Sequence, residues 1–499
     1  MSQIRKRSLR AASWIYTGFF VGAINTYLFT HESWFTPSQY GLTRSLLDIG
    51  LLICAFSTLG VTNFLVKFFP YYSDNLEKKN NDILSLALYI SISGFVISSV
   101  SLFALQPLII KKFGTNSPLL VEYFYYVIPL SFFVLLYNIL ESYAYGFEKG
   151  VLTSLLKETI LRFYTTVIIV LKIFNVISFQ QFILLFSLQY LLIVVILALH
   201  LKKENKLWLS FTTSRVSRKF RKRIIAMLCF TFIVIIVSVL RQSIDGLVLA
   251  AKQDLGKVGI FGFSAYLVSV MQAPFRSLVA ITVPILSRSW KDKNIKEIQR
   301  IYKRSSINLL AFALFIFICV LLNFDNAILF FNIDPAYLQG KWVFILLGLV
   351  TIVEMGTGVN GQIIGTSTYW RFELWTSLLL TSLIIPLSYF LTVKYGIIGP
   401  AMANLVSFTA YNAIRTWYLW KKYRMQPFSK KTLEIVVIAA AAYWLVHTVS
   451  QGNSGLITMI LSTAAFTIIY AGLLYYRNIS PDVKPVVNSV LKRFKRQRP

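Results

Sequence analysis

Two opposite charges stand one helical turn apart in a strongly apolar stretch of the chain. Arg241 and Asp245 follow the run CFTFIVIIV, and their i, i+4 spacing places both side chains on one face of a helix. Such a pair can neutralise itself and so lower the cost of roughly 2.5–3.5 kcal/mol for each charge placed in hydrocarbon. Alternatively, both can face water or a polar ligand. We favour the second interpretation, because a purely structural site could use apolar residues at lower cost.

Arg276 is a second charge in an apolar segment, and it has no opposite charge within a turn of sequence. Gln272 stands one turn before it. The planar guanidinium of arginine suits bidentate binding of phosphate. We therefore predict that Arg276 contacts a phosphate group, with Gln272 and Arg241 as further ligand contacts.

Three carboxylates also lie within apolar segments: Asp48, Glu141 and Glu354. A desolvated carboxylate titrates nearer neutral pH, so these three are candidates for coupling to a proton or an ion. They could equally pair with the arginines, and the sequence does not separate the two roles. Two amides in similar positions, Asn25 and Asn360, are predicted to contact the same polar ligand.

Four further charges stand close to predicted helix ends. Lys157, Glu158, Arg162 and Arg415 are expected to extend to the cytoplasmic interface, as long charged side chains near helix ends usually do.

The residues give no support for an enzyme. No P-loop, dinucleotide fingerprint or nucleophile elbow is present in the sequence, so we expect no cofactor and no catalytic residue. A nucleic-acid partner is not expected either, because the basic residues do not form a folded module with stacking aromatics. The cysteines and histidines are scattered without metal-ligand spacing, at Cys54, Cys229, Cys319, His31, His200 and His447.

These side chains must be positioned by membrane-spanning helices. The chain has 499 residues, of which 56% are hydrophobic and 14% are charged, whereas soluble domains contain roughly 25% charged residues. Runs of about 20 apolar residues are long enough to cross the hydrocarbon as helices. The sequence predicts an all-α polytopic membrane protein with about fourteen such spans, at 11–30, 45–68, 83–107, 119–145, 151–174, 178–200, 224–250, 259–286, 305–331, 342–365, 372–392, 397–420, 432–449 and 455–476.

Lysine and arginine set the orientation. Most of the 50 Lys and Arg residues fall in the loops on the side of the N-terminus, most densely in 202–223, 288–304 and 421–431. The positive-inside rule then predicts that both termini are cytoplasmic. The formal net charge of +30 is explained in the same way, and the basic loops are expected to rest against anionic lipids.

The two halves of the chain resemble each other. Pro70 and Pro284 precede similar Lys/Asn-rich stretches, and Gly146 and Gly365 follow corresponding spans. These echoes indicate a duplicated six-helix lobe, an arrangement whose substrate site lies between the repeats in many transporters. We predict an N-terminal lobe (1–201), a basic cytoplasmic linker (202–223), a C-terminal lobe (224–424), two further helices (425–476) and a basic cytoplasmic tail (477–499).

Several stretches are similar to a known family, the polysaccharide flippases of the Wzx type in the multidrug/oligosaccharidyl-lipid/polysaccharide exporter superfamily. Pro400 departs from the family, which more often has Ala there. The similar stretches are LFTHESWFTPSQYGLTRSLLDIG (28–50), RQSIDGLVLAAKQDLGKVGIFGFSAYLVSV (241–270), PILSRSW (284–290) and YGIIGPAMANLVSF (395–408).

The resemblance implies a flippase that moves an oligosaccharide linked to undecaprenyl pyrophosphate from the inner to the outer leaflet of the cytoplasmic membrane. The activity would serve cell-surface polysaccharide synthesis such as that of O-antigen, by alternating access between two six-helix lobes. Polysaccharide polymerase machinery is an implied partner. A cation-coupled multidrug exporter of the same superfamily and a lipid II flippase are the alternatives. The basic bias of the intramembrane residues and the two extra helices favour the first interpretation.

Overall fold

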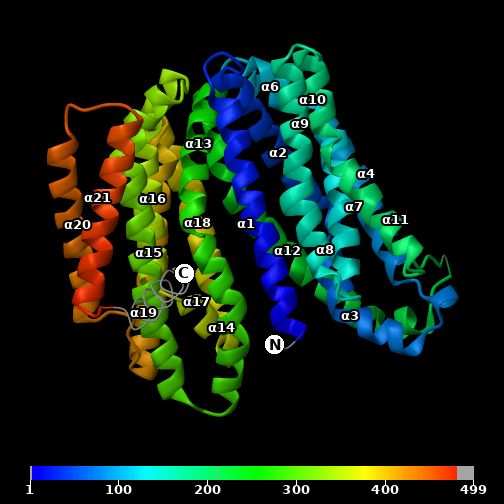
Figure 1. Cartoon of the computed structure of the whole chain (residues 1–499). Helices are drawn as coiled ribbons and strands as arrows, with labels where there is room; N and C mark the ends of the chain where they lie inside the picture. Colours follow the sequence, from blue (N-terminus) through cyan, green and yellow to red (C-terminus); the bar gives the residue numbers. More distant parts are fainter. Residues whose placement is uncertain (1–2, 211, 480–499) are drawn as a thin grey trace, which may run out of the picture. The chain divides into compact units, whose positions relative to one another are not determined.

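The chain is almost entirely helical in a computed structural model, which describes residues 3–210 and 212–479 (Figure 1). It divides into two compact units, residues 1–262 and 263–499. This division is made on spatial contacts and does not test the predicted boundary between two sequence repeats at 202–223, which stays a prediction. Most of the predicted tail, 477–499, lies outside the described residues.

Unit 1 is organised around one central helix, α2, which packs against α4, α7 and α12. Its start is fixed locally, because Thr36 and Gln39 form a reciprocal capping box and Pro37 occupies the first turn; this arrangement satisfies amide groups that a helix start leaves free. The helices of the unit are α1 (Gln3–Thr30), α2 (Pro37–Thr58), α3 (Val61–Asn75), η1 (Lys78–Asn80), α4 (Ile83–Ala104), α5 (Gln106–Phe113), α6 (Pro118–Glu122), η2 (Phe124–Tyr126), α7 (Val127–Tyr145), α8 (Gly150–Ser154), η3 (Leu155–Ile160), α9 (Leu161–Ile173), α10 (Phe179–Ser187), α11 (Gln189–Lys203) and α12 (Arg215–Lys252).

Unit 2 is organised around α15, which packs against α14, α16, α20 and α21. The last two helices lie side by side (Figure 1). Buried Asn323 of α15 joins them to the unit, donating to Thr463 at 2.9 Å and accepting from Ser462 at 3.0 Å. The boundary between the two units falls within α13 (Leu255–Met271). The other helices of unit 2 are α14 (Ala273–Lys291), α15 (Ile295–Phe330), η4 (Pro335–Gly340), α16 (Lys341–Gly356), α17 (Asn360–Thr366), α18 (Trp370–Tyr395), α19 (Ile398–Tyr423), α20 (Lys430–Ser450) and α21 (Leu456–Tyr476).

All fourteen predicted spans fall on helical segments. Within the described residues, ten helices are long and apolar enough to cross a membrane. The other four predicted spans correspond to α1, to α8–η3–α9, to α13–α14 and to α19, which are more polar or interrupted. The prediction of an all-α polytopic membrane protein is therefore confirmed, while the number of spans and the location of the termini stay predictions.

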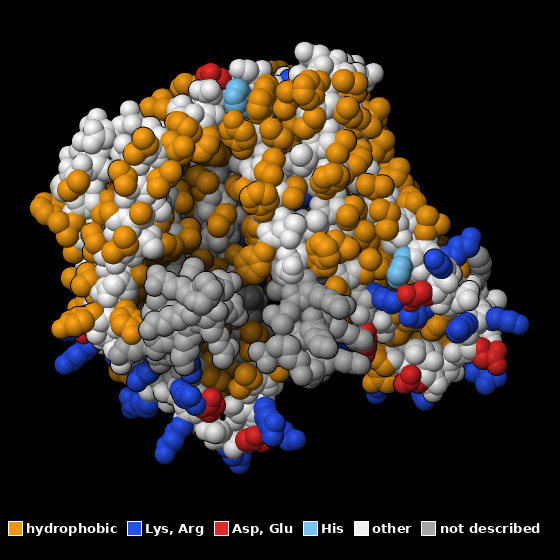
Figure 2. Space-filling model, in the orientation of Figure 1, with side chains coloured by type: hydrophobic (Ala, Val, Ile, Leu, Met, Phe, Trp, Pro, Cys, Tyr) orange, Lys and Arg blue, Asp and Glu red, His pale blue; other side chains and the backbone are white. Residues whose placement is uncertain are grey.

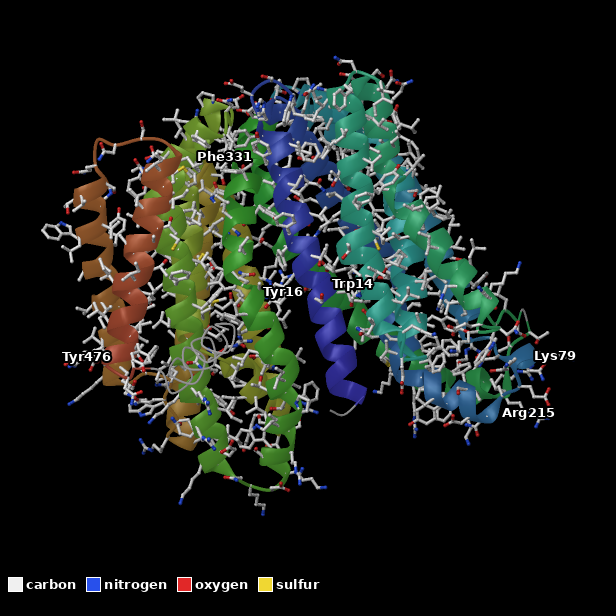
Figure 3. The ribbon with its side chains drawn as sticks, in the orientation of Figure 1. Trp14, Tyr16, Lys79, Arg215, Phe331 and Tyr476 are labelled. Atoms are coloured by element: carbon white, nitrogen blue, oxygen red, sulfur yellow. The ribbon has the colours of Figure 1, made fainter. Side chains whose placement is uncertain are left out.

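Polar and apolar side chains separate along each unit. Large apolar side chains are exposed along the helices, among them Val449 at 79% and Ile468 at 73% exposed, as expected for helices in contact with lipid (Figure 2). In unit 1, Lys79 and Arg215 lie together at one end, and in unit 2, Phe331 and Tyr476 lie at opposite ends (Figure 3). This arrangement agrees with the alternation of helix directions that the sequence predicts.

Several predicted spans are interrupted rather than continuous, and three of these breaks adjoin candidate residues. The span 45–68 breaks at Leu59 and Gly60, which have φ values of 46° and 83°. The span 259–286 breaks at Gln272, and the span 342–365 breaks at Thr357–Val359. The prediction that these spans are continuous helices was wrong at these residues, because the apolar composition of a segment does not reveal a local change of backbone direction.

Tight packing covers the break at Gly60. A Cβ atom at this position would lie 2.3 Å from Thr231 Oγ1 and 2.5 Å from the Leu228 carbonyl oxygen of α12. The Thr231 hydroxyl lies 3.2 Å from the Gly60 carbonyl, to which it donates. Irregular backbone at membrane depth is tolerated where protein covers it, so α12 stabilises the break.

The segment between α11 and α12 is shorter than the predicted linker and is docked on unit 1. Residues 215–223 already belong to α12. The Trp208 ring lies against Phe147, with a ring separation of 5.2 Å. Asp82 accepts from the Ser214 amide at 2.9 Å and from the Ser217 hydroxyl at 2.8 Å. The segment is therefore held by side chains from the α3–α4 and α7–α8 connections.

We predict that Gly60→Ala destabilises the protein more than Gly452→Ala does. Both glycines have positive φ, so both substitutions carry the left-handed backbone cost of roughly 1–2 kcal/mol. Only at Gly60 would the new methyl group collide with α12, since no atom lies within 4 Å at Gly452. Thermal unfolding of the purified variants in detergent measures the difference. Equal losses of stability would show that α12 does not constrain the break.

We also predict that Glu204 makes unit 1 less stable in acid. Hydrogen bonds from Lys149 and Lys206 lower the pKa of Glu204 to about 2, and His200 lies 3.0 Å away. A carboxyl group with a lowered pKa stabilises the fold fully above about pH 4.5, its usual pKa, and the contribution is lost as the pH falls towards 2. Melting temperatures measured across this range should fall more steeply for the wild type than for Glu204→Gln. Parallel curves would contradict the prediction.

Candidate functional site

A cavity of about 250 Å³ lies inside unit 1, beside the break between α2 and α3. Helices α2, α3, α7 and α12 each contribute to its wall. Four of the ten lining residues are apolar, and the other six carry hydroxyl, amide, thiol or carboxylate groups. The lining residues are Leu51, Cys54, Ala55, Thr58, Thr62, Asn138, Glu141, Ser142, Ile235 and Val239.

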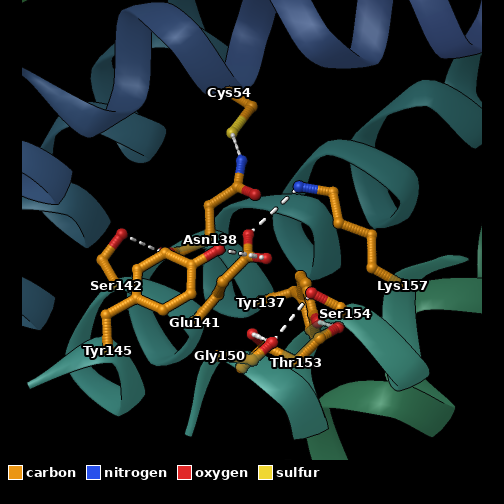
Figure 4. Close-up of polar contacts among 10 residues, drawn as sticks. All are labelled: Cys54, Tyr137, Asn138, Glu141, Ser142, Tyr145, Gly150, Thr153, Ser154 and Lys157. Atoms are coloured by element: carbon orange, nitrogen blue, oxygen red, sulfur yellow. Dashed lines mark hydrogen bonds and ion pairs between the residues drawn. The ribbon is translucent and has the colours of Figure 1, made fainter. Parts of the chain in front are cut away.

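An ion pair forms one end of this cavity. Glu141 Oε2 accepts from Lys157 Nζ at 3.1 Å, and Glu141 Oε1 accepts from the Tyr145 hydroxyl at 3.0 Å (Figure 4). The Glu141 side chain is 11% exposed and the Lys157 side chain is 39% exposed. Glu141 therefore pairs with a lysine of the next span rather than with one of the intramembrane arginines.

A π-helical turn positions Lys157. The turn covers Leu155–Ile160, and π-helical turns inside α-helices are frequent at functional sites. It begins two residues after Thr153, whose carbonyl oxygen accepts from the Tyr137 hydroxyl at 2.9 Å. The backbone of the turn also packs closely on α1, since a Cβ at Gly18 would lie 2.2 Å from the Glu158 carbonyl oxygen. The extension of Lys157 to the interface stays a prediction, and the structure adds that its ammonium group pairs with Glu141.

The neighbouring charges of the same span also turn inward. Arg162 pairs with Glu158 at 2.9 Å, and the Arg162 guanidinium lies over the ring of Phe19 on α1. Both side chains are less than one third exposed. The extension of these two side chains to the interface stays a prediction.

Three predicted residues of α2 and α12 lie in a second polar region of unit 1. Asp48 is within electrostatic range of Arg44 and Asp245. Helices α2 and α12 approach closely here, since a Cβ at Gly246 would lie 2.5 Å from Asp48 Oδ2. Arg241 lies one turn before Asp245 and is half-buried. The structure thus brings Asp48 and Asp245 together, and their roles stay predictions.

Asn25 is buried between α1 and α9. Its amide nitrogen donates to the Arg162 carbonyl at 2.8 Å, and its carbonyl oxygen accepts from Thr166 at 2.6 Å. This amide therefore joins two helices in the structure. Its predicted contact with a ligand stays a prediction.

In unit 2, Arg276 lies directly after a break in the backbone. Gln272 caps α14, Pro274 occupies the first turn, and Arg276 follows with an exposed side chain. An arginine in the first turn of an interrupted helix adds its charge to the positive end of the helix dipole. This position suits the predicted contact with an anion, which stays a prediction.

Glu354 and Asn360 flank the second break of unit 2. Glu354 lies in the last turn of α16. Asn360 begins α17, is 3% exposed and donates to Asn412 Oδ1 at 3.0 Å. Thr357 donates to the same oxygen at 3.0 Å. A polar network with α19 therefore holds this break, and Asn360 is part of it.

Arg415 is a buried residue that the sequence interpretation assigned to the interface. It pairs with Glu373 of α18, and its guanidinium lies 3.7 Å from the centre of the Tyr411 ring. The side chain is only 8% exposed. The prediction that Arg415 lies at the interface was wrong. Its partner carboxylate belongs to another helix, so the sequence spacing within one helix does not reveal the pair.

Sequence reasoning identified Glu141 as a carboxylate within an apolar segment but did not find its surroundings. The Tyr145 contact was visible as an i, i+4 pair, whereas Cys54 and Lys157 come from other helices. Asn138 donates to Cys54 Sγ at 3.3 Å. Among residues 3–210 and 212–479, no group of three or more His, Cys, Asp or Glu side chains could hold a metal ion.

The fold is similar to solved membrane transporters. A lipid II flippase, MurJ in an inward closed conformation, has a TM-score of 0.73 and 16% identity over 95% of this chain and 99% of its own. A multidrug resistance MATE family transporter of the MOP superfamily, inward-facing, has a TM-score of 0.60 and 14% identity over 83% of this chain and 99% of its own.

A MOP superfamily transporter from Pyrococcus furiosus, described as having a binding pocket of reverse polarity, has a TM-score of 0.55 and 13% identity over 84% of this chain and 95% of its own. No protein-family model and no curated protein sequence matches the chain. At these identities the likeness shows the fold, which is that of the multidrug/oligosaccharidyl-lipid/polysaccharide exporters.

We predict that Lys157→Met destabilises unit 1 by about 1–3 kcal/mol, because it leaves the largely buried Glu141 carboxylate without its cation. The double variant Glu141→Gln with Lys157→Met should be more stable than Lys157→Met alone. Thermal unfolding of the single and double variants measures this coupling.

The matched control is the exposed pair of Arg300 and Glu297, separated by 3.3 Å, where Arg300→Met should change stability by less than about 0.5 kcal/mol. Additive effects of the Glu141 and Lys157 substitutions would contradict the prediction.

Proposed function

We propose that this protein is a flippase for an oligosaccharide linked to undecaprenyl pyrophosphate. It would move the headgroup from the inner to the outer leaflet of the cytoplasmic membrane by alternating access, while the lipid tail stays in the bilayer. The product would serve the synthesis of a cell-surface polysaccharide, as in the polysaccharide flippases that several stretches of the sequence resemble. Transport and not catalysis is the activity we assign.

The observation that carries the proposal is the extent of the structural likeness. The lipid flippase structure covers 95% of this chain, whereas the multidrug transporters cover 83–85%. The larger share of the chain that is covered is expected if the chain has two helices in addition to the twelve of its two predicted lobes. It supports the lipid-linked class over the drug-exporting class, and it does not identify the sugar.

Arg276 is our candidate for the pyrophosphate contact. Its exposed side chain follows an interrupted helix, and in transporters the N-terminal ends of half-helices often point at anionic substrate groups. Gln272 precedes the same break and supplies an amide. Arg241 and Asp245 are proposed as further contacts of the headgroup.

The intramembrane carboxylates are proposed as coupling groups. Glu141 is held by Lys157 and Tyr145, so a change in its protonation would release a lysine at the cavity. Glu354 adjoins the break after α16, and Asp48 lies near Asp245. Asn25 and Asn360 are engaged in helix packing, and we assign them the positioning of the groups around them.

Two alternatives are tested by the same experiments. A multidrug exporter would bind lipophilic cations, which the carboxylate of Glu141 could attract if Lys157 moved away. A lipid II flippase would favour an arginine cluster within the first two membrane spans of the N-terminal lobe. There Arg44 alone is available, and it donates to the Gly262 carbonyl at 3.2 Å. Anionic lipids and polysaccharide polymerase machinery remain proposed partners.

The function is tested by mass spectrometry of lipid extracts from a strain that lacks this gene and retains its glycan pathway. We predict accumulation of an undecaprenyl-pyrophosphate oligosaccharide, which complementation with the wild-type gene reverses. An unchanged lipid pool would contradict the proposal and favour a drug exporter.

The role of Arg276 is tested by complementation of that strain. Arg276→Ala should reduce translocation by about tenfold or more, since a charge-assisted hydrogen bond contributes about 1.5–3 kcal/mol, and Arg276→Lys should retain part of the activity. Arg288→Ala, on the same helix and with an 86% exposed side chain, should behave as wild type. Full activity of a correctly inserted Arg276→Ala variant would show that Arg276 does not bind the phosphate.

A further inference from the structure

The cavity beside the α2–α3 break is rich in hydrogen-bond acceptors. Thr58 and Ser142 donate to carbonyl groups of their own helices, which leaves their oxygen lone pairs for a ligand. Asn138 Oδ1 has no hydrogen-bond partner among the described residues. Glu141 uses two of about four acceptor positions of a carboxylate. A ligand with several donors would therefore fit this wall.

The charge of the cavity wall is balanced. The Glu141 carboxylate is paired with Lys157 at 3.1 Å, so the wall favours neither a free cation nor a free anion. A phosphate group accepts hydrogen bonds and cannot donate them when ionised, so it does not match an acceptor-rich wall. Neutral hydroxyl groups, which donate as well as accept, do match it.

The remaining lining residues are apolar. They are Leu51 and Ala55 of α2 and Ile235 and Val239 of α12. Ligand sites of this kind combine apolar surface with a few placed polar groups. A sugar ring has the corresponding shape, with C–H groups on its faces and hydroxyl groups around its edge.

The size limits the occupant. The cavity holds about 250 Å³, which is below the range of about 300–1,000 Å³ that drug-sized ligands occupy. An oligosaccharide would not fit inside it, whereas one sugar ring would.

From these observations, we propose that the cavity binds a single neutral sugar residue of the transported headgroup. The inference rests on the proposed function and deepens it. Asn138, Glu141 and Ser142 accept hydrogen bonds from the sugar hydroxyls, and the Thr62 side chain, which lies at the start of α3, completes the ring of polar contacts. The cavity would thereby separate recognition of the sugar from that of the pyrophosphate, which is assigned to Arg276 in unit 2.

Saturation-transfer NMR on the purified full chain in lipid nanodiscs tests the proposal directly. The probes are free N-acetylglucosamine, glucose, galactose, mannose and rhamnose, together with tetraphenylphosphonium as a lipophilic cation. The variants are Asn138→Leu and Ser142→Ala, which remove hydrogen-bonding groups, and Val239→Phe, which fills the cavity from α12. The matched control is Ser382→Ala, an exposed serine of α18 that also donates to a carbonyl of its own helix, at 2.8 Å.

We expect at least one sugar to bind the wild type. Its affinity should fall about tenfold in Asn138→Leu, as for the loss of one hydrogen bond to a ligand in a desolvated site. Val239→Phe should also weaken binding, Ser142→Ala should have a smaller effect, and Ser382→Ala should have none. Binding of no sugar, or of a sugar that the cavity variants do not affect, overturns the proposal. Binding of tetraphenylphosphonium alone, weakened by the same variants, overturns it in favour of a cation site.

The outcome is distinguishable from that of the proposed function. Accumulation of a lipid-linked oligosaccharide in the deletion strain together with a failure of every sugar to bind leaves the flippase and rejects the sugar site. An unchanged lipid pool rejects the flippase, whatever the NMR result.

Discussion

The structure depends on one constraint, which is that backbone amide and carbonyl groups in hydrocarbon must find partners within the protein. Helices satisfy it everywhere except at their breaks. At Gly60 the irregular backbone is covered by α12, and the Thr231 hydroxyl donates to the Gly60 carbonyl oxygen. At Gly358 it is covered by α15, where a Cβ would lie 2.8 Å from Ser305 Oγ. At both of these positions a neighbouring helix packs against the break.

The same constraint explains where the polar residues gather. A break leaves space and changes the helix direction, and in unit 1 a cavity lies beside it. Charges near such a space must be paired or solvated. Glu141 and Lys157 are paired across two helices. Arg276, at the start of α14, has an exposed side chain. The candidate charges of the two units thus differ in burial, since the Glu141 carboxylate is largely buried and the Arg276 side chain is exposed.

The candidate site was only partly predictable from the sequence. Glu141 and Asn138 could be identified because a carboxylate and an amide in an apolar helix are costly and rarely incidental. Their partners could not be identified, because Lys157 and Cys54 come from other helices and no sequence spacing reveals that approach. Arg415 was misassigned for the same reason, since its partner Glu373 lies on the adjacent helix α18. Asn25 and Asn360 were predicted to contact a polar ligand, which stays a prediction, and their helix-packing contacts became visible only in three dimensions.

The sequence by itself determined that the chain folds in a lipid bilayer and that its fold is helical. Apolar runs of about 20 residues predict spanning helices, and this information is local because each helix satisfies its own hydrogen bonds. Only the tertiary structure decided where those helices break, which charges pair and where a cavity remains. These features depend on contacts between residues far apart in the chain, such as Gly60 with Thr231 and Glu141 with Lys157. The fold class therefore follows from local chemistry, and the candidate site follows from packing.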